Sequence, residues 1–192
     1  AKDKSVIGIL VTGEEITQQK QAEAHLNDWK TAVIRIAEAD LALREMTDTS
    51  ATWEKIAASA ARLCPTAHSG LWHISADQAA AVLRAGTGKL SNMVGVQIKG
   101  GEDLVWKVWQ NGQPVSLADY SSWASRGLWL GESGFSGAAG IPLKIKSQVV
   151  FVITLFFDKP GQVFSEEQIQ WLSFYAQLAS SKLQSSERSA VF

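Results

Sequence analysis

Residues 140–157 read GIPLKIKSQVVFVITLFF, and the pattern of this stretch points to the fold class. Apolar residues alternate with other residue types over 141–146, which predicts a strand with one buried face and one exposed face. Residues 149–157 contain one polar side chain, Thr154, among Val, Ile, Leu and Phe, which is typical of a central strand covered on both faces. Residues 146–148 form the polar turn between the two strands. A sheet with a buried centre needs helices on its faces.

The composition restricts the class of protein and its partners. The chain has 192 residues, of which 46% are hydrophobic and 19% are charged, with a formal net charge of -1. This balance, without a cluster of Lys and Arg, argues against a nucleic-acid partner. The single cysteine excludes an internal disulfide and a cysteine-rich metal site, and it predicts a reducing, cytoplasmic location. No apolar run reaches the roughly 18 residues that cross a bilayer, so we expect no membrane contact by this segment.

The first 20 residues carry a pattern of their own. Residues 5–11 read SVIGILV, which predicts a short strand, and TGEEITQQK follows at residues 12–20. The combined Gly-x-x-x-x-Gly-Glu-Glu-Ile-Thr pattern resembles the last strand and exit of a PAS domain, where the chain runs straight into a helix. Glu15 stands where Asp is usual. The resemblance implies that residues 1–20 end a PAS domain that precedes this segment in the full protein.

A long helix is predicted over residues 17–46. Its apolar residues recur at spacings of four and three, which is a heptad seam. A second set of apolar residues lies beside the seam, so we expect one face to pack on the core and the other to form a homodimer with a partner helix. The seam consists of Ala22, Leu26, Trp29, Val33, Ile36 and Leu43, and is interrupted at Asp40.

The rest of the chain alternates helices and strands. Helices are predicted from an N-cap within residues 47–50 to Pro65, over 102–110 and from 165 on. Strands are predicted over 68–75, 79–85, 94–99 and 114–117, besides the central pair. The last helix begins with a capping box, Ser165 to Gln168, and has more apolar surface than one sheet face needs, which predicts a partner helix. The elements predict an α/β (α+β) fold of three layers, α/β/α, around a mainly antiparallel sheet of about six strands, with long N- and C-terminal helices.

Three stretches between about Leu41 and Leu183 resemble GAF domains. They are IKGGEDLVWKVWQNGQPV at residues 98–115, IPL at 141–143 followed by VVFVITL at 149–155, and FSEEQIQWL at 164–172. Trp106 and Phe151 stand where the family usually has glycine. The resemblance implies a GAF domain, of the PAS/profilin-like architecture, at residues 47–186, followed by a tail at 187–192.

The resemblance also implies a role. GAF domains of this kind are non-catalytic sensory or regulatory modules of bacterial multidomain signalling proteins, such as sensor histidine kinases of two-component systems and diguanylate cyclases. By resemblance, the segment binds a small molecule or relays a signal through dimeric N- and C-terminal helices to an output domain that follows in the same chain. The alternative is a ligand-free structural dimerisation module whose pocket is filled by Trp106, Trp109 and Phe151.

Aromatic side chains mark the candidate ligand-binding site. Trp106 and Trp109 lie three residues apart on the short helix and face the same way, and residues 119–140 form a long irregular connection rich in aromatic residues. Such rings suit a cage for a flat or cationic ligand, and the same rings equally suit a filled pocket. The candidate ligand-binding residues are Trp106, Trp109, Asp119, Tyr120, Trp123, Trp129, Phe135 and His73.

The residue types argue against catalysis and known cofactors. Covalent bilin attachment in phytochrome-like GAF domains uses Cys followed by His, whereas Cys64 is followed by Pro65. One thiol cannot form the disulfide that free methionine sulfoxide reductases require, and we interpret Cys64 as a small core residue. No Ser/His/Asp set or paired-carboxylate motif is present, so no catalytic residue, metal or cofactor is assigned. Haem or carboxylate binding by His73 or His68 is the alternative to a hydrogen-bonded strand histidine.

Overall fold

The structure, a computed structural model, describes residues 4–64, 68–101, 103–127 and 134–189, with side chains from residue 16 to residue 185 inside those ranges. The chain divides into two units, residues 1–35 and residues 36–192. Helix α1, Lys4–Arg44, is continuous through both. No helix in the described part of the chain is both long enough and apolar enough to cross a membrane.

The N-terminal segment is helical, so the strand predicted for residues 5–11 is wrong. These residues form the first turns of α1, which is 41 residues long. The short apolar run of residues 5–11 fits a strand or a helix equally well. A helix satisfies its backbone N–H and C=O groups without a neighbouring strand. The long helix predicted over residues 17–46 is confirmed as part of α1, which ends at Arg44. The assignment of residues 1–20 to the end of a PAS domain stays a prediction.

Six strands form one antiparallel sheet, which confirms the predicted fold class. Their spatial order is β3-β2-β1-β6-β5-β4. The long strand β6 lies at the centre between β1 and β5, as its continuous apolar run predicts. The strands are β1 (His68–Ile74), β2 (Ala80–Gly86), β3 (Gln97–Lys99), β4 (Val115–Leu117), β5 (Ala138–Ile145) and β6 (Gln148–Phe156).

The predicted hairpin is formed by β5 and β6. Its turn lies at Lys146 and Ser147, whose φ angles are +50° and +70°. β4 pairs with β5 only as far as Gly140, so residues 141–145 form an outer half of β5 that pairs with β6 alone among the described strands. Pro142 lies in this outer half, where a strand edge tolerates a residue without an N–H group.

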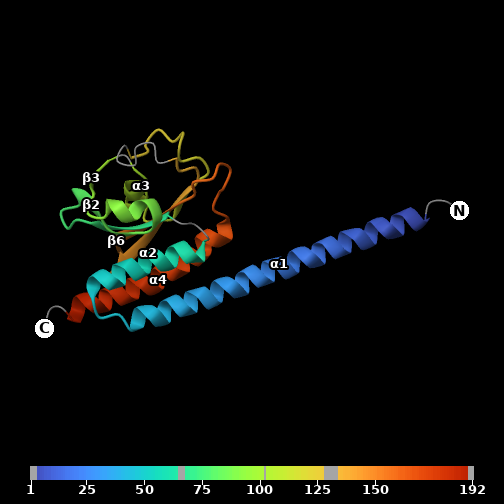
Figure 1. Cartoon of the computed structure of the whole chain (residues 1–192), viewed down its shortest axis with the longest axis horizontal. Coiled ribbons are helices and arrows are strands. Elements are labelled where there is room, and N and C mark those ends of the chain that lie inside the picture. Colours follow the sequence, from blue (N-terminus) through green and yellow to red (C-terminus); the bar gives the residue numbers. More distant parts are fainter. Residues whose placement is uncertain (1–3, 65–67, 102, 128–133, 190–192) are drawn as a thin grey trace. The chain divides into compact units, whose positions relative to one another are not determined.

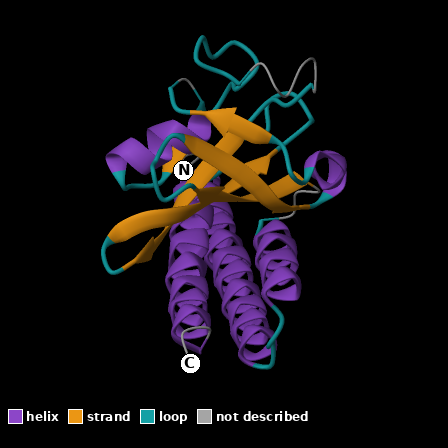
Figure 2. Cartoon of the chain, turned by 90° about the vertical axis from the view of Figure 1, so that its left-hand side faces the viewer, coloured by secondary structure: helices purple, strands orange, loops and turns teal. Residues whose placement is uncertain are grey.

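Helices α2 (Thr49–Leu63) and α4 (Glu166–Ser189) lie side by side on one face of the sheet (Figure 1, Figure 2). Their buried residues pack against Leu71, Ile141, Ile153 and Leu155 of the strands. The Tyr175 hydroxyl of α4 donates to the carbonyl oxygen of Ile56 at 3.4 Å. Part of the apolar side of α4 that we expected a partner helix to cover is therefore covered by α2.

Both helices begin as the sequence predicts. The Asp48 carboxylate accepts a hydrogen bond from the N–H of Ala51 and caps α2. The capping box before α4 is reciprocal, because Ser165 Oγ accepts from the N–H of Gln168 and Gln168 Oε1 accepts from the N–H of Ser165, at 3.2 and 3.0 Å.

Helix α3 (Leu104–Asn111) covers the other face of the sheet, together with the short 3-10 helix η1 (Gly88–Met93) and the described parts of the irregular segment before β5 (Figure 1, Figure 2). A Cβ atom on Gly140 would lie 2.5 Å from Val108 Cγ2, so α3 packs on β5 at a distance that only glycine permits there. The strand predicted over residues 94–99 is shorter than expected. It begins at Gln97, because Gly95, with φ +94°, bends the chain just before it.

Candidate functional site

Five aromatic side chains are buried together on the α3 face of the sheet. Trp72 comes from β1, Phe156 from β6, Trp106 from α3, and Tyr120 and Phe135 from the irregular segment. Each exposes at most 2% of its surface. The Phe135 and Phe156 rings stack with centroids 4.6 Å apart, and Tyr120 meets Phe156 edge-on at 5.2 Å. We refer to these five residues as the aromatic cluster.

Two half-buried tryptophans form the rim of the aromatic cluster. Trp109 contacts Trp106 with ring centroids 5.4 Å apart and planes at 81°, which confirms that the two residues share one side of α3. Trp123 lies 5.9 Å from Tyr120, and the Lys107 ammonium lies 5.7 Å from the Trp123 ring centre.

The polar atoms of the aromatic cluster differ in their hydrogen bonds. Trp72 Nε1 donates to Thr154 Oγ1 at 3.1 Å. Trp106 Nε1 is buried and has no hydrogen-bond partner within the described part of the chain. The Tyr120 hydroxyl accepts from the N–H of Gly127, and burial followed by the negative charge of Asp103 raises its pKa, so it remains a neutral phenol.

The carboxylates of Asp103 and Asp119 accept hydrogen bonds from nearby backbone N–H groups. Asp103 is 3% exposed and caps α3 by accepting from the N–H of Val105 at 3.2 Å. Asp119 is exposed, and its carboxylate accepts from Ser121 Oγ at 2.6 Å and from the N–H of Ser122 at 3.2 Å. These hydrogen bonds, with that from the Ser121 hydroxyl the largest cause, lower the pKa of Asp119 to about 2. The carboxylate therefore closes a turn beside the cluster.

Two residues expected at the pocket lie on the opposite face of the sheet. His73 and Phe151 are paired across β1 and β6, with ring centroids 4.7 Å apart, and Phe151 packs with Trp53 of α2. Neighbouring residues of a strand point to opposite faces, so Val152 and not Phe151 packs in the same core as the aromatic cluster. The prediction that Phe151 fills the pocket with Trp106 and Trp109 is therefore wrong. Trp129 lies outside the described residues.

Trp72 and Phe156 of the aromatic cluster were not among the residues predicted from the sequence. The signal for Trp72 was present, because strand alternation places Trp72 and Ile74 on one face and Leu71 and His73 on the other. The choice between those two faces required knowing which one the helices α2 and α4 cover. Phe156 follows from the same alternation along β6.

His68 connects three segments near Phe135. Its Nδ1 accepts from the N–H of Lys89 at 3.2 Å, so the ring proton lies on Nε2, which donates to Asp158 Oδ2 at 3.2 Å. Both ring nitrogens are thus engaged with the protein, which argues against a haem-ligand role. The described residues contain no group of three His, Cys, Asp or Glu side chains able to hold a metal ion.

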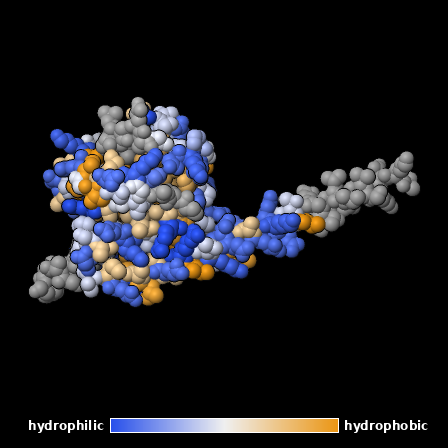
Figure 3. Space-filling model, viewed as in Figure 1, coloured by the Kyte–Doolittle hydropathy of each residue, from blue (hydrophilic) through white to orange (hydrophobic). Residues whose placement is uncertain are grey.

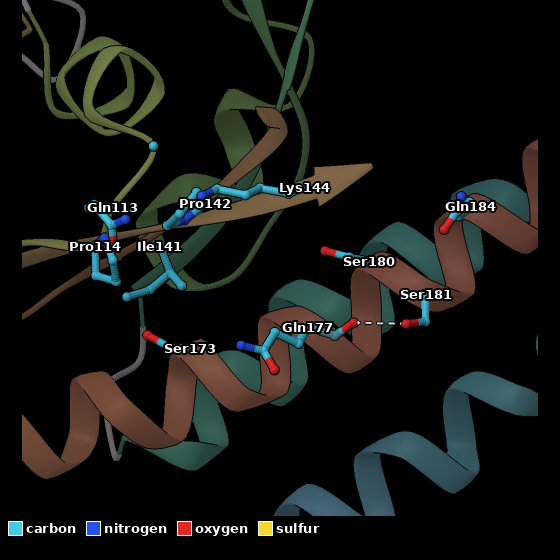
Figure 4. Close-up of a pocket in the computed structure, with 11 residues that line it drawn as sticks. Gln113, Pro114, Ile141, Pro142, Lys144, Ser173, Gln177, Ser180, Ser181 and Gln184 are labelled. Atoms are coloured by element: carbon cyan, nitrogen blue, oxygen red, sulfur yellow. Dashed lines mark hydrogen bonds between the residues drawn. The ribbon is translucent and has the colours of Figure 1, made fainter. Parts of the chain in front are cut away.

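Two open grooves lie at the outer half of β5. The first, of about 370 Å3, lies between β5 and α4, and Figure 4 shows residues of the strand on one side and residues of the helix on the other. The second, of about 590 Å3, lies at the end of the sheet beside the last turn of α3 and includes His73 and Trp109. Gly112 and Lys144 line both grooves. The structure therefore brings two predicted site residues, His73 and Trp109, to one groove, which borders the aromatic cluster at its rim residue Trp109.

The sequence of residues 47–184 matches the family described as GAF domain. Among solved structures, the GAF domain of a phosphoenolpyruvate-protein phosphotransferase from Coxiella burnetii superposes with a TM-score of 0.75 at 18% identity, covering 84% of this chain and 97% of that one. No curated protein matches this chain.

Two other solved structures have the same fold. Free methionine-R-sulfoxide reductase from Neisseria meningitidis, in complex with its substrate, has a TM-score of 0.71 at 17% identity and covers 83% of this chain and 93% of its own. Residues 122 to 287 of a methyl-accepting chemotaxis protein have a TM-score of 0.69 at 12% identity, with coverages of 80% and 99%. At these identities the likeness shows the fold alone.

Proposed function

The chain belongs to the GAF domain family, and from that premise we propose that it is a non-catalytic sensory or regulatory domain that relays a signal through a homodimer of its terminal helices. Domains of this family typically serve as such modules in signalling proteins. The proposal includes a cytoplasmic multidomain protein in which a PAS domain precedes this segment and an output domain, such as that of a histidine kinase or a diguanylate cyclase, follows it.

The observation that carries the dimer is an exposed apolar seam on α1. Leu26, Trp29 and Val33 are 49%, 54% and 44% exposed, and their spacing continues to Ile36 and Leu43, which are buried in the core. In Figure 3 the described surface of α1 is mainly hydrophilic and is broken by separate hydrophobic side chains. Large apolar side chains at heptad spacing gain free energy when a second helix removes them from water.

The relay is supported by a connection between the end of α1 and α4. The Lys182 ammonium of α4 donates to the carbonyl oxygens of Met46 at 2.7 Å and Arg44 at 3.4 Å. Arg44 is the last residue of α1, and its carbonyl is among those that a helix leaves without an internal partner. A rotation or shift of the end of α1 would therefore act directly on α4.

The ligand-free transmitter remains a second candidate, and the aromatic cluster favours it. Its five side chains belong to one hydrophobic core cluster and are almost fully buried, so they supply the apolar filling that a ligand would otherwise provide. Trp106 Nε1, which has no hydrogen-bond partner among the described residues, favours the opposite interpretation, because a buried donor gains from an acceptor supplied by a ligand.

The dimer is tested by sedimentation equilibrium of the wild type and two aspartate variants. We expect a dimeric wild type and a monomeric Leu26→Asp variant with unchanged circular dichroism from the sheet domain. Asn27→Asp is the matched control, since it places the same charge on the neighbouring, polar position of the helix. Ile36 is unsuitable for this test because it packs in the core, where a carboxylate would unfold the domain. A monomeric wild type, or a Leu26→Asp dimer as tight as the control, contradicts the proposal.

Native and denaturing mass spectrometry distinguish the two candidates for the ligand. A dimer that carries a small adduct, lost on denaturation, supports a ligand-binding sensor and gives the mass of the ligand. A dimer of the bare chain mass, in freshly prepared protein, supports the ligand-free transmitter.

A further inference from the structure

We propose that the two grooves that meet at Lys144 form a binding site for a small planar organic anion of the aromatic carboxylate class. Lys144 neutralises the carboxylate, and Trp109 contacts the ring. The site lies on the outer half of β5, so it does not depend on the dimer seam of α1, and it borders the aromatic cluster only at the rim residue Trp109.

The charge of the grooves is the first argument. The chain as a whole is balanced, with 19 acidic and 18 basic residues. Among the described residues that line the two grooves none is acidic, while Lys144 lines both and His73 lines the larger one. A concave surface that carries a lysine and no carboxylate has a positive potential, which attracts anions.

Lys144 is available to an anion. Its side chain is exposed, and within the described part of the chain its ammonium has no hydrogen bond or ion pair. The ammonium lies beside Gly112, 3.6 Å from where a Cβ of that residue would be, at the C-terminal end of α3. The partial negative charge of a helix C-terminus favours a cation there, so this end of α3 holds the ammonium over the junction of the grooves.

The carboxylate of Asp77, whose neighbours in sequence line the larger groove, is hydrogen-bonded within its own turn. Asp77, in the turn between β1 and β2, accepts from Ser75 Oγ at 2.6 Å and from the N–H of Ala79 at 3.1 Å. It does not line either groove, although Ser75 and Gln78 on both sides of it do. The other polar groups that line the larger groove are neutral amide and hydroxyl donors, including Asn111 and Gln148, which suit the oxygens of a carboxylate.

Trp109 supplies the surface for a ring. It is half-buried, lines the larger groove, and is held by its edge-on contact with Trp106 at 5.4 Å. A tryptophan that is fixed in orientation contacts a planar ligand at a low cost in side-chain entropy. The volume of about 590 Å3 lies in the range of small-molecule sites.

The proposal is tested by NMR titration of the complete 192-residue chain with 2-naphthoate, and in parallel with its neutral counterpart 2-naphthamide. We expect 2-naphthoate to shift the Trp109 indole N–H and the backbone amides of Gly112 and Gln148. The amide should bind about tenfold more weakly, because a charge-assisted hydrogen bond to Lys144 is lost. Raising the ionic strength should weaken the binding of 2-naphthoate and leave that of the amide unchanged.

Lys144→Gln should weaken the binding of 2-naphthoate about tenfold and leave that of 2-naphthamide within about twofold. Lys159→Gln is the matched control, since Lys159 is also exposed in a turn and only its backbone carbonyl makes a described contact. The spectra of both variants show directly that they remain folded. No groove-localised shifts at about 10 mM 2-naphthoate, shifts confined to the aromatic cluster, or equal affinity of Lys144→Gln and wild type would each overturn the proposal.

Discussion

The indole N–H of Trp72 in β1 donates to the Thr154 hydroxyl in β6, with 3.1 Å between Nε1 and Oγ1, and neither residue is exposed. Thr154 is the one polar side chain in the apolar run of residues 149–157. Its role follows from this contact, because a tryptophan buried on the face of a central strand needs an acceptor for its N–H group. The hydrogen bond to Trp72 therefore explains why the apolar run contains a polar residue at Thr154.

Replacing Thr154 by valine should destabilise the domain by about 1–3 kcal/mol. The shape of the side chain is nearly kept, but the Trp72 N–H stays buried without its acceptor, which costs the desolvation of that group. Urea unfolding followed by tryptophan fluorescence measures the change. Thr154→Ser keeps the hydroxyl and should recover much of the loss, so a serine variant no more stable than the valine variant would contradict this account.

The absence of a Cβ atom at Gly140 should also contribute to the stability of the domain. Gly140→Ala should cost about 1–3 kcal/mol, because the new Cβ would lie 2.5 Å from Val108 Cγ2 and 3.2 Å from Leu104 Cγ and would push α3 away from β5. Gly100→Ala is the control, since a Cβ there would make only ordinary contacts at 3.8 Å, and it should change stability by less than about 0.5 kcal/mol. Equal unfolding midpoints for the two variants would show that α3 adapts freely.

The central part of the fold was predictable because the local signals there agree with one another. The continuous apolar run gives β6 its central place, and the reciprocal hydrogen bonds of Ser165 and Gln168 are those expected from the residue types alone. The helical state of residues 5–11 was not predictable, because a run of seven mostly apolar residues has no period that separates a strand from a helix.

The candidate site was predictable only in part, and strand alternation explains the difference. Trp106, Tyr120 and Phe135 lie on one face of the sheet, whereas His73 lies on the other. The sequence does not say which of the two faces α2 and α4 cover. The grooves at Lys144 were not predicted at all. They arise where β4 stops pairing with β5 at Gly140 and where α4 passes the edge of β5. Both features depend on how distant segments pack together, which no local sequence pattern predicts.

The contact between Asp158 and His68 should make stability depend on pH in a defined direction. The hydrogen bond from His68 lowers the pKa of the Asp158 carboxyl from its ordinary value of 3.8. The folded pKa is lower than the unfolded one, so this contribution is fully present above pH 3.8 and is lost as the pH falls through the folded pKa. The single variants Asp158→Asn and His68→Gln, with the double variant, should give a coupling free energy at pH 7 that disappears in acid. A coupling that grows below pH 3.8 would contradict the assignment.

Cys64 should be chemically inert in the native protein. Its side chain is fully buried at the end of α2, and its Sγ lies 3.9 Å from the carbonyl oxygen of Gln168. A buried thiol reacts only when the domain opens, so Ellman's reagent should label native Cys64 at least about 1000-fold more slowly than the urea-unfolded chain.

The matched control for this experiment carries Lys159→Cys in a Cys64→Ala background. Lys159 is exposed in a turn, so its replacement should react at the rate of a free thiol in native protein. The native labelling rate of Cys64 should rise in the Gly140→Ala variant, because destabilising the domain raises its open fraction while leaving the thiol itself unchanged. Rapid labelling of native Cys64 would instead mean an accessible thiol, and the non-catalytic interpretation of this domain would then have to include thiol chemistry at the end of α2.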